Sequence, residues 1–138
     1  MKIIEIETRR RVEFIEITAS VKKAVKESKI KEGICIIFCP HTTAGLLINE
    51  NADPSVRKDI ISQLEKLVPQ DERYSHLEGN ADAHIKSSLL GNSLNLIIHE
   101  EELILGTWQG IYFCEFDGPR KRKVYLKLIS VDKGGKFI

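Results

Sequence analysis

Two histidines, a glutamate, an asparagine and an aspartate crowd into the segment "HLEGNADAH", which runs from His76 to His84. A third histidine, His41, stands in "PHTTAG", directly after the apolar run "ICIIFC". Imidazole binds metal ions and exchanges protons near neutral pH, so each is a candidate ligand or acid–base group. If the loop doubles back before the next helix, the three imidazoles converge and leave one position open for water or substrate. The sequence therefore predicts a histidine-rich site for a divalent metal, zinc or magnesium, or for a substrate.

The same segment also has a purely structural interpretation. Asp82 would cap a short helix that ends near Gly91, while residues 79–80 form a turn and both loop histidines lie on the surface. His41 would then be a hydrogen-bonded residue at the rim of the core. The eight-residue spacing of the two loop histidines matches no compact zinc motif such as HExxH. Both interpretations stay open from the spacing alone.

A phosphate site is a further interpretation of this segment. Backbone amides at the start of the predicted helix, together with Lys86, Ser87 and Ser88, would hold an anion. Unpaired N–H groups and the helix dipole both favour negative charge there. The chain has no P-loop motif, so this interpretation depends on local geometry alone.

The segment "GTWQGIYFCEFDGPR" holds the remaining candidates, Gln109 and Arg120. It lies at the edges of predicted strands, where a scaffold presents functional groups. The basic run from Arg120 to Lys123 has no interleaved aromatic residues for stacking on bases. A solvated turn is therefore favoured over a nucleic-acid interface, and nucleic acid is not an expected partner.

The surrounding patterns predict both helices and strands. "KIIEIET" and "RVEFIEI" predict an opening hairpin, and "TASVKKAVKESK" predicts a helix capped by Thr18 or Ser20. The continuous apolar run "ICIIFC" predicts a central strand with both faces covered. Asp53 and Pro54 predict the start of a second helix. Its apolar stripe consists of Val56, Ile60, Leu64 and Leu67. The remaining predicted strands are "HTTAGLLINE", "SLNLIIH", "ELILG", "WQGIYFCEF" and "KVYLKLISV".

Length and composition predict one soluble domain. The 138 residues suffice for one hydrophobic core, and a net charge of +1 provides no overall attraction to nucleic acid or acidic lipid. No apolar run spans a bilayer, and the charged N-terminus lacks the apolar core of a signal peptide, so we expect a cytoplasmic protein without a membrane partner. Cys35, Cys39 and Cys114 stand in apolar runs without CxxC spacing, which predicts buried, reduced thiols.

Three segments together resemble one known family. "PHTTAGLLINENADPSVRKD", "HLEGNADAHIKSSLLG" and "LGTWQGIYFCEFDGPRKRKV" are similar to the YjbQ-like family, also described as secondary thiamine-phosphate synthases. The resemblance covers the chain from about Phe14 to Ser130. It implies a single α+β domain over residues 1–138 with a large mixed, mostly antiparallel sheet or sandwich and two to three helices. It also implies a homotrimer and a polar site at the three histidines.

The resemblance further implies a transferase that joins a pyrimidine diphosphate to a thiazole phosphate with loss of pyrophosphate. The alternative is a non-catalytic trimer that binds a divalent metal or a small phosphorylated metabolite. The candidate catalytic residues are His41, His76, His84 and Glu78, of which the three histidines are also the candidate metal ligands. The candidate ligand-binding residues are Thr42, Asn80, Asp82, Lys86, Gln109 and Arg120.

Overall fold

The computed structural model describes residues 1–71 and 73–131 of the chain. Within these residues the chain forms a single α+β domain of three helices and eight strands, and every strand pairing is antiparallel. The predicted fold class is confirmed. In chain order the elements are β1 (Lys2–Glu7), β2 (Glu13–Glu16), α1 (Thr18–Ser28), β3 (Glu32–Phe38), β4 (Ala44–Glu50), α2 (Pro54–Leu67), α3 (Ala81–Leu90), β5 (Ser93–His99), β6 (Glu102–Leu103), β7 (Gln109–Glu115) and β8 (Lys121–Ser130).

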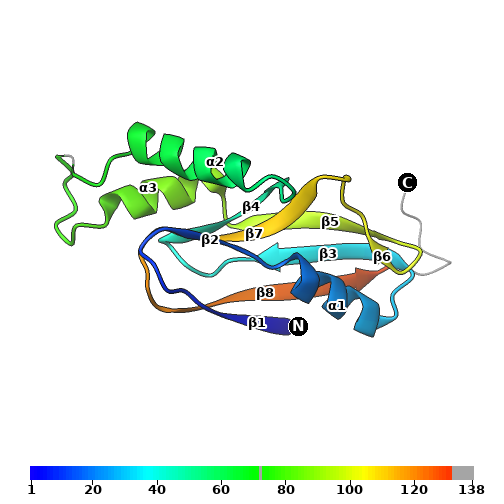
Figure 1. Cartoon of the computed structure of the whole chain (residues 1–138). Coiled ribbons are helices and arrows are strands. Elements are labelled where there is room, and N and C mark those ends of the chain that lie inside the picture. Colours follow the sequence, from blue (N-terminus) through cyan, green and yellow to red (C-terminus); the bar gives the residue numbers. More distant parts are fainter. Residues whose placement is uncertain (72, 132–138) are drawn as a thin grey trace.

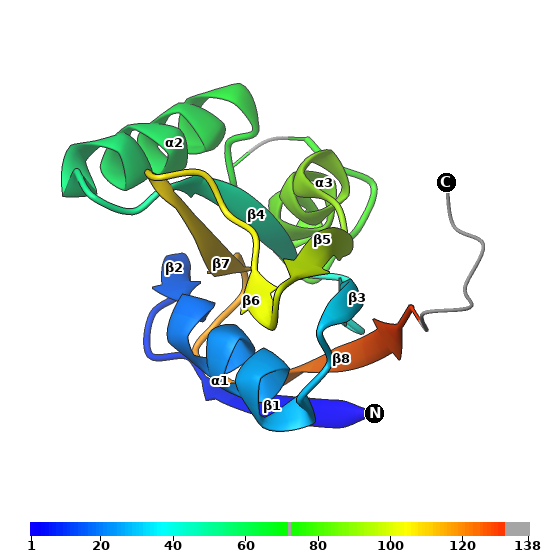
Figure 2. The same cartoon turned by 90° about the vertical axis from the view of Figure 1, so that its right-hand side faces the viewer.

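The elements form three layers, which Figures 1 and 2 show from two sides. Helices α2 and α3 form the first layer. A small sheet with strand order β2-β7-β4 forms the second layer, and a large sheet with order β1-β8-β3-β5-β6 forms the third. Helix α1 contacts β6, β7 and β8, and so covers one open side of the space between the sheets.

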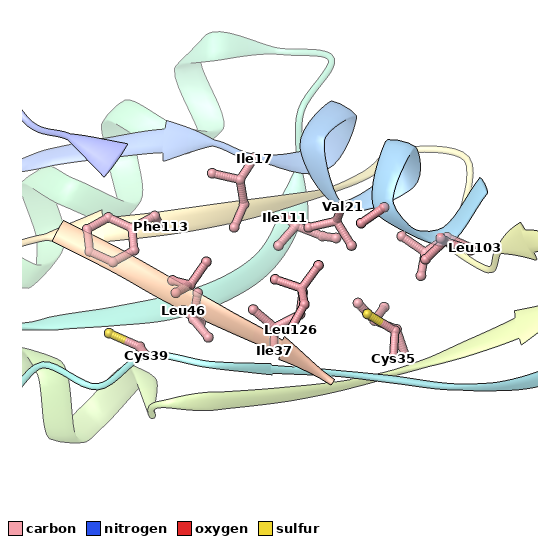
Figure 3. Packing of buried hydrophobic residues seen from close by; sticks show 14 of the residues in the cluster. Ile17, Val21, Cys35, Ile37, Cys39, Leu46, Leu103, Ile111, Phe113 and Leu126 are labelled. Atoms are coloured by element: carbon pink, nitrogen blue, oxygen red, sulfur yellow. The ribbon is translucent and has the colours of Figure 1, made fainter. Parts of the chain in front are cut away.

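The main hydrophobic core lies between the two sheets and α1, as the side chains in Figure 3 show. Ile37 and Leu126 from the large sheet meet Leu46 and Phe113 from the small sheet, and each is at most 1% exposed. A second cluster fills the space between the small sheet and the helices α2 and α3. Its buried members are Phe14, Ala83, Tyr112, Cys114 and Phe116.

Of the strands with continuous apolar runs, β7 has both faces covered and β3 does not. Every residue of β7 from Gly110 to Glu115 is buried, because the helices cover one face and the large sheet covers the other. In β3, Cys35 and Ile37 are buried, but Ile34 and Phe38 are 37% and 41% exposed on the outer face. The prediction that both faces of β3 are covered is therefore wrong for a single chain. Helices α2 and α3 pack on the small sheet and leave this outer face of the large sheet open.

The predicted opening hairpin is also wrong. Strand β1 pairs with β8 in the large sheet, whereas β2 pairs with β7 in the small sheet. The arginine-rich connection between β1 and β2 therefore crosses from one sheet to the other. It runs beside the 116–120 crossing, since Thr8 N donates to Arg120 O at 3.0 Å and Gly118 N donates to Arg11 O at 3.0 Å.

The predicted start of α2 is confirmed, and the predicted cap of α1 is not. Asp53 caps α2 by accepting a hydrogen bond from Ser55 N at 2.9 Å, and Pro54 is the first helical residue, as predicted. Helix α1 begins at Thr18 without a side-chain cap. The Thr18 hydroxyl instead accepts a hydrogen bond from Ile111 N at 2.8 Å, so it joins the helix to β7. The predicted cap at Thr18 or Ser20 is wrong.

The apolar stripe of α2 is only partly covered. No residue of this helix is buried, and Leu67 is 65% exposed. Ile60, Ile61 and Leu64 pack as half-buried residues against the second cluster. Since a single copy leaves this stripe partly open, α2 contributes less to the core than its pattern indicates.

The three cysteines are buried free thiols, as predicted. Burial raises the pKa of all three, and that of Cys35 to about 11. None of the helices in the described ranges has the length and apolar character needed to span a membrane.

Candidate functional site

His41 follows the end of β3, and its side chain takes the place of a backbone partner for β8. Pro40 has no N–H, so ladder pairing between β3 and β8 stops at Phe38 and Tyr125. The His41 Nε2 atom then lies 3.0 Å from the backbone N and 3.1 Å from the backbone O of Lys123. The imidazole thereby takes up polar groups that β3 leaves unpaired.

The surroundings of His41 favour a neutral imidazole. Desolvation lowers the pKa of His41, and the positive charge of Arg122 lowers it further. The ring meets that of Phe113 edge to face, with centroids 6.3 Å apart and an interplanar angle of 90°. A neutral ring held in this way is suited to accept a proton or to bind a cation through its free nitrogen.

Helix α3 brings His84 into the same pocket as His41. A pocket of about 440 Å³, called here the histidine pocket, lies between the end of β3 and the C-terminal half of α3. The predicted ligand-binding residue Thr42 lies beside His41 in its wall. The lining residues are His41, Thr42, His84, Ser87, Ser88, Gly91 and Asn92.

The position of α3 follows from a close approach to β4. A Cβ atom at Gly45 would lie 2.9 Å from Gly91 O, so only glycine fits there without displacing the helix end. Ser87 Oγ donates to Ala44 O at 2.6 Å, and Leu46 N donates to Gly91 O at 3.1 Å. These contacts bring His84 to the pocket.

His76 lies beside His84 but does not line the histidine pocket. The two rings meet edge to face with centroids 5.3 Å apart, and His76 Nε2 is 3.7 Å from Glu78 Oε2. His76 and Glu78 are both exposed. His84 thus shares a pocket with His41 and a ring contact with His76, whereas His41 and His76 do not line one pocket together. Within residues 1–71 and 73–131, no three His, Cys, Asp or Glu side chains form a group that fits a metal ion.

A second pocket adjoins His41 on the side of strands β1 and β8. It has a volume of about 550 Å³ and is called here the lysine pocket. Lys121 and Lys123 stand opposite Glu7 and Glu5 in the strand register. In the described part of the chain, neither lysine forms an ion pair within 4.0 Å. The lining residues are Glu5, Ile6, Glu7, His41, Lys121, Arg122 and Lys123.

Asp82 and Lys86 form a buried ion pair instead of lining either pocket. Asp82 Oδ2 lies 2.8 Å from Lys86 Nζ, and both side chains are 0% exposed. Arg11 contacts both oxygens of Asp82, at 2.9 and 3.3 Å, and Glu65 lies 2.8 Å from Lys86 Nζ. Burial disfavours the charged form of Asp82, but the hydrogen bonds from Arg11 and Lys86 outweigh it and lower its pKa. The predicted cap at Asp82 is therefore wrong, since Asn80 precedes the helix and makes no side-chain cap.

The predicted phosphate site at the start of α3 does not form as expected. Lys86 forms the buried ion pair with Asp82. Ser87 and Ser88 lie in the second half of α3, away from the amides at its N-terminus. The Ser88 hydroxyl donates to His84 O at 2.9 Å. An anion at this helix start would lack the three side chains proposed for it.

Asn80 and Arg120 meet at the other end of α3. Asn80 Nδ2 donates to Asp117 Oδ2 at 2.8 Å, and Arg120 Nη2 lies 3.0 Å from the same oxygen. The buried Oδ1 atom of Asn80 has no hydrogen-bond partner among the described residues. Gln109 begins β7 at the opposite end from Glu115, and its Oε1 accepts from Gly106 N at 2.8 Å. These predicted residues do not line the histidine pocket.

The structure adds residues that the patterns did not single out. Arg122 and Glu115 form a buried ion pair next to the His41 loop, and Arg122 Nη2 donates to Thr43 Oγ1 at 2.8 Å. Glu115 Oε1 also accepts from the Thr8 hydroxyl at 2.8 Å. The sequence signal was a charged residue inside the apolar run "YFCEF", a position at which an unpaired carboxylate would be costly.

The model of the YjbQ-like UPF0047 family matches residues 2–131 of the chain. The chain belongs to this family. Among relatives, a UPF0047 protein of Methanocaldococcus jannaschii is 56% identical over 126 residues, which cover 91% of each chain. The UPF0047 protein YugU of Bacillus subtilis is 50% identical over 131 residues, covering 94% of this chain and 99% of its own.

Solved structures agree with the fold of this YjbQ-like chain. An uncharacterized YjbQ/UPF0047 family protein of Clostridium acetobutylicum superposes with a TM-score of 0.92 at 54% identity, covering 94% of this chain and 100% of its own. A conserved hypothetical protein of Thermus thermophilus gives 0.86 at 39% identity, with coverage of 94% and 100%. These names describe a family and a fold and state no activity.

Proposed function

We propose that this YjbQ-like protein is a transferase with a two-pocket site centred on His41. The observation that carries the proposal is that His41 lines both the histidine pocket and the lysine pocket. A reaction that joins two small molecules needs two binding places that share a reactive group. One acid–base side chain between two pockets of about 440 and 550 Å³ meets this need.

The chemistry of the two pockets fits a phosphorylated substrate pair. Lys121 and Lys123 supply positive charge for a diphosphate. Glu5 and Glu7 line the same pocket opposite them, but in the described residues neither forms an ion pair with these lysines within 4.0 Å. Cationic side chains stabilise the charge that develops on a departing diphosphate. The thiazole nitrogen forms the new C–N bond through its lone pair while the C–O bond to the diphosphate breaks, so no proton leaves the ring. His41 and His84 would give a proton to the departing pyrophosphate. The resemblance supplies the substrates, a pyrimidine diphosphate and a thiazole phosphate.

The test is a turnover assay with both precursors that measures released pyrophosphate. We expect release by the parent protein, loss of release in His41→Gln, and full release in the matched control His99→Gln. His99 is an exposed histidine paired with Glu32, away from both pockets. Absence of pyrophosphate release by the folded parent protein would refute the transferase proposal.

The competing proposal is a binding protein without turnover. Neutral imidazoles bind divalent metals, and the C-terminal half of α3 in the pocket wall favours a cation. His41 and His84 supply two ligands at most, so a metal would need further ligands from its substrate or a second subunit. Calorimetry with zinc, magnesium and pyrophosphate separates the alternatives: ligand binding that is lost in His41→Gln, together with no turnover, favours the binding protein.

A homotrimer is also part of the proposal, and the outer face of the large sheet supports it. Ile97, Ile34 and Ile129 stand side by side across three neighbouring strands, and all are at least 37% exposed. Phe38 and Tyr125 form another outer row, separated from the first by the row of Asn95, Ile36 and Lys127. Exposed apolar side chains that stand side by side on a sheet face mark a site of protein contact, and a second copy of the chain would cover them.

A further inference from the structure

The Nε2 atom of His41 is already bonded to the protein, which limits what the ring offers to a ligand. This nitrogen lies within hydrogen-bond distance of both the N–H and the C=O of Lys123. A neutral imidazole either accepts from the N–H or donates to the C=O at Nε2. In both tautomers, as in the imidazolium form, Nε2 stays bonded to the same residue.

The other ring nitrogen, Nδ1, has no hydrogen-bond partner in the described part of the chain. When Nε2 donates to the carbonyl of Lys123, Nδ1 carries a lone pair and can take a proton. When Nε2 accepts from the amide, Nδ1 carries the proton and can donate it. One backbone residue that offers both a donor and an acceptor therefore supports both working states of Nδ1.

Hydrogen bonds from the buried Arg122 side chain hold together the two segments that make this contact. The guanidinium of Arg122, the residue before Lys123, donates to Thr43 Oγ1 at 2.8 Å and to Thr43 O at 3.4 Å. Thr43 follows His41 by two residues. Two adjacent links thus join residues 41–43 to residues 122–123, one through the imidazole and one through the guanidinium.

Glu115 orients that guanidinium. It accepts from Arg122 Nε at 2.8 Å and from Nη2, and its second oxygen accepts from the backbone N–H groups of Phe116 and Asp117 at 3.1 Å each. Phe116 N in turn donates to Thr43 O at 3.2 Å. The carboxylate therefore joins β7 to β8 directly and to the His41 loop through Arg122. Arg122 and Glu115 are 6% and 0% exposed.

We propose that His41 acts on its ligand through Nδ1, and that Arg122 and Glu115 are the positioning residues that hold it in this orientation. The statement about a ligand rests on the proposed two-pocket site. The statement about orientation does not, because it concerns the free protein. The charged groups near His41 are Arg122 and Lys123 from β8 and Glu115 from β7. Glu5, Glu7 and Lys121 line the lysine pocket with it, and His84 of α3 shares the histidine pocket.

Hydrogen exchange of the Lys123 amide tests the orientation without any ligand. We expect protection in the parent protein, loss of protection in His41→Gln, and partial loss in Thr43→Val, which removes only the hydroxyl that Arg122 contacts. The amide of Val124, in the same strand, is the internal control and should stay protected in all three. Thr43→Val is the main variant because Glu115→Gln removes a buried charge and risks unfolding. A Lys123 amide that exchanges equally in the parent and in His41→Gln would overturn the orientation.

Nitrogen-15 spectra of histidine-labelled protein identify the working atom, with His41 assigned through the His41→Gln spectrum. Addition of pyrophosphate should move the Nδ1 resonance and leave Nε2 in place, and Thr43→Val should weaken this response. A shift centred on Nε2 would overturn the inference. If pyrophosphate moves neither nitrogen, the inferred action through Nδ1 fails together with the two-pocket proposal, while the exchange result still decides the orientation.

Discussion

The substitution Asp82→Asn distinguishes two roles for this side chain, a helix cap and a member of a buried ion network, because it removes the charge and keeps the shape. Asparagine caps helices as well as aspartate does, so a capping role predicts almost no change in stability. The structure instead places Asp82 between Arg11 and Lys86, at 0% exposure. Removing one partner of a buried ion pair costs about 3–5 kcal/mol, because the other charge is left uncompensated.

The geometry favours the lower end of that range. Without the Asp82 charge, the buried Lys86 ammonium keeps Glu65, whose side chain is 39% exposed. Arg11 is 29% exposed and turns to water at little cost. We therefore expect Asp82→Asn to lose about 3 kcal/mol. Lys86→Met should lose less, since Asp82 keeps both contacts with Arg11. Because the two residues share one interaction, the double variant should lose less than the sum.

The assay is urea unfolding of the three variants at equal protein concentration, since oligomerisation would shift apparent stability. Asp53→Asn is the matched control, because Asp53 is a true cap and the same exchange there should leave the midpoint unchanged. The pKa of Asp82 is lowered in the folded chain, so its stabilisation is present above its ordinary pKa of about 3.9 and is lost as the pH falls. The difference between the parent and Asp82→Asn should therefore shrink below about pH 4. Equal midpoints for the two proteins at pH 7 would refute the network.

Three further results follow from the packing. Gly45→Ala should lower the thermal midpoint, because its Cβ would lie 2.9 Å from Gly91 O; an unchanged midpoint would contradict this close approach. The thiols should resist a thiol reagent in the folded protein, since burial raises their pKa, and rapid modification of Cys39 would contradict a structural role. Ile34→Lys should convert the proposed trimer to a monomer near 15.7 kDa in light scattering, and a parent protein of that mass would exclude the trimer.

Local chemistry predicted the elements that depend on neighbouring residues only. The start of α2 needs nothing beyond Asp53, Pro54 and the amide of Ser55, which are adjacent in the chain. The end of β3 also has a local cause, because Pro40 lacks the backbone N–H that would continue the hydrogen bonding of the strand. Both features were predictable since their physical causes act within a few residues.

Coverage of a strand has no such local cause. The runs "ICIIFC" and "IYFCEF" are both continuous and apolar, yet only β7 is covered on both faces in one chain. The difference arises because α2 and α3 pack against the small sheet. The composition of a strand shows that it tolerates burial, whereas the helices that bury it are positioned by residues elsewhere. In β3, the proposed second copy would supply the cover that a helix supplies for β7.

For the site residues too, the position along the chain was predictable, whereas the role depends on distant residues. The strand-end position of His41 was predictable from Pro40, but the nitrogen that remains free depends on Lys123, 82 residues further along. Asp82 sits where a cap would sit in sequence, and Arg11, 71 residues away, makes it an ion-pair partner instead. A polar side chain at the end of a helix or strand can cap, pair or bind a ligand. Which role it takes depends on the residue from a distant part of the chain that contacts it. For His41 that partner is a backbone group with both a donor and an acceptor, which occupies one nitrogen and leaves the other for chemistry.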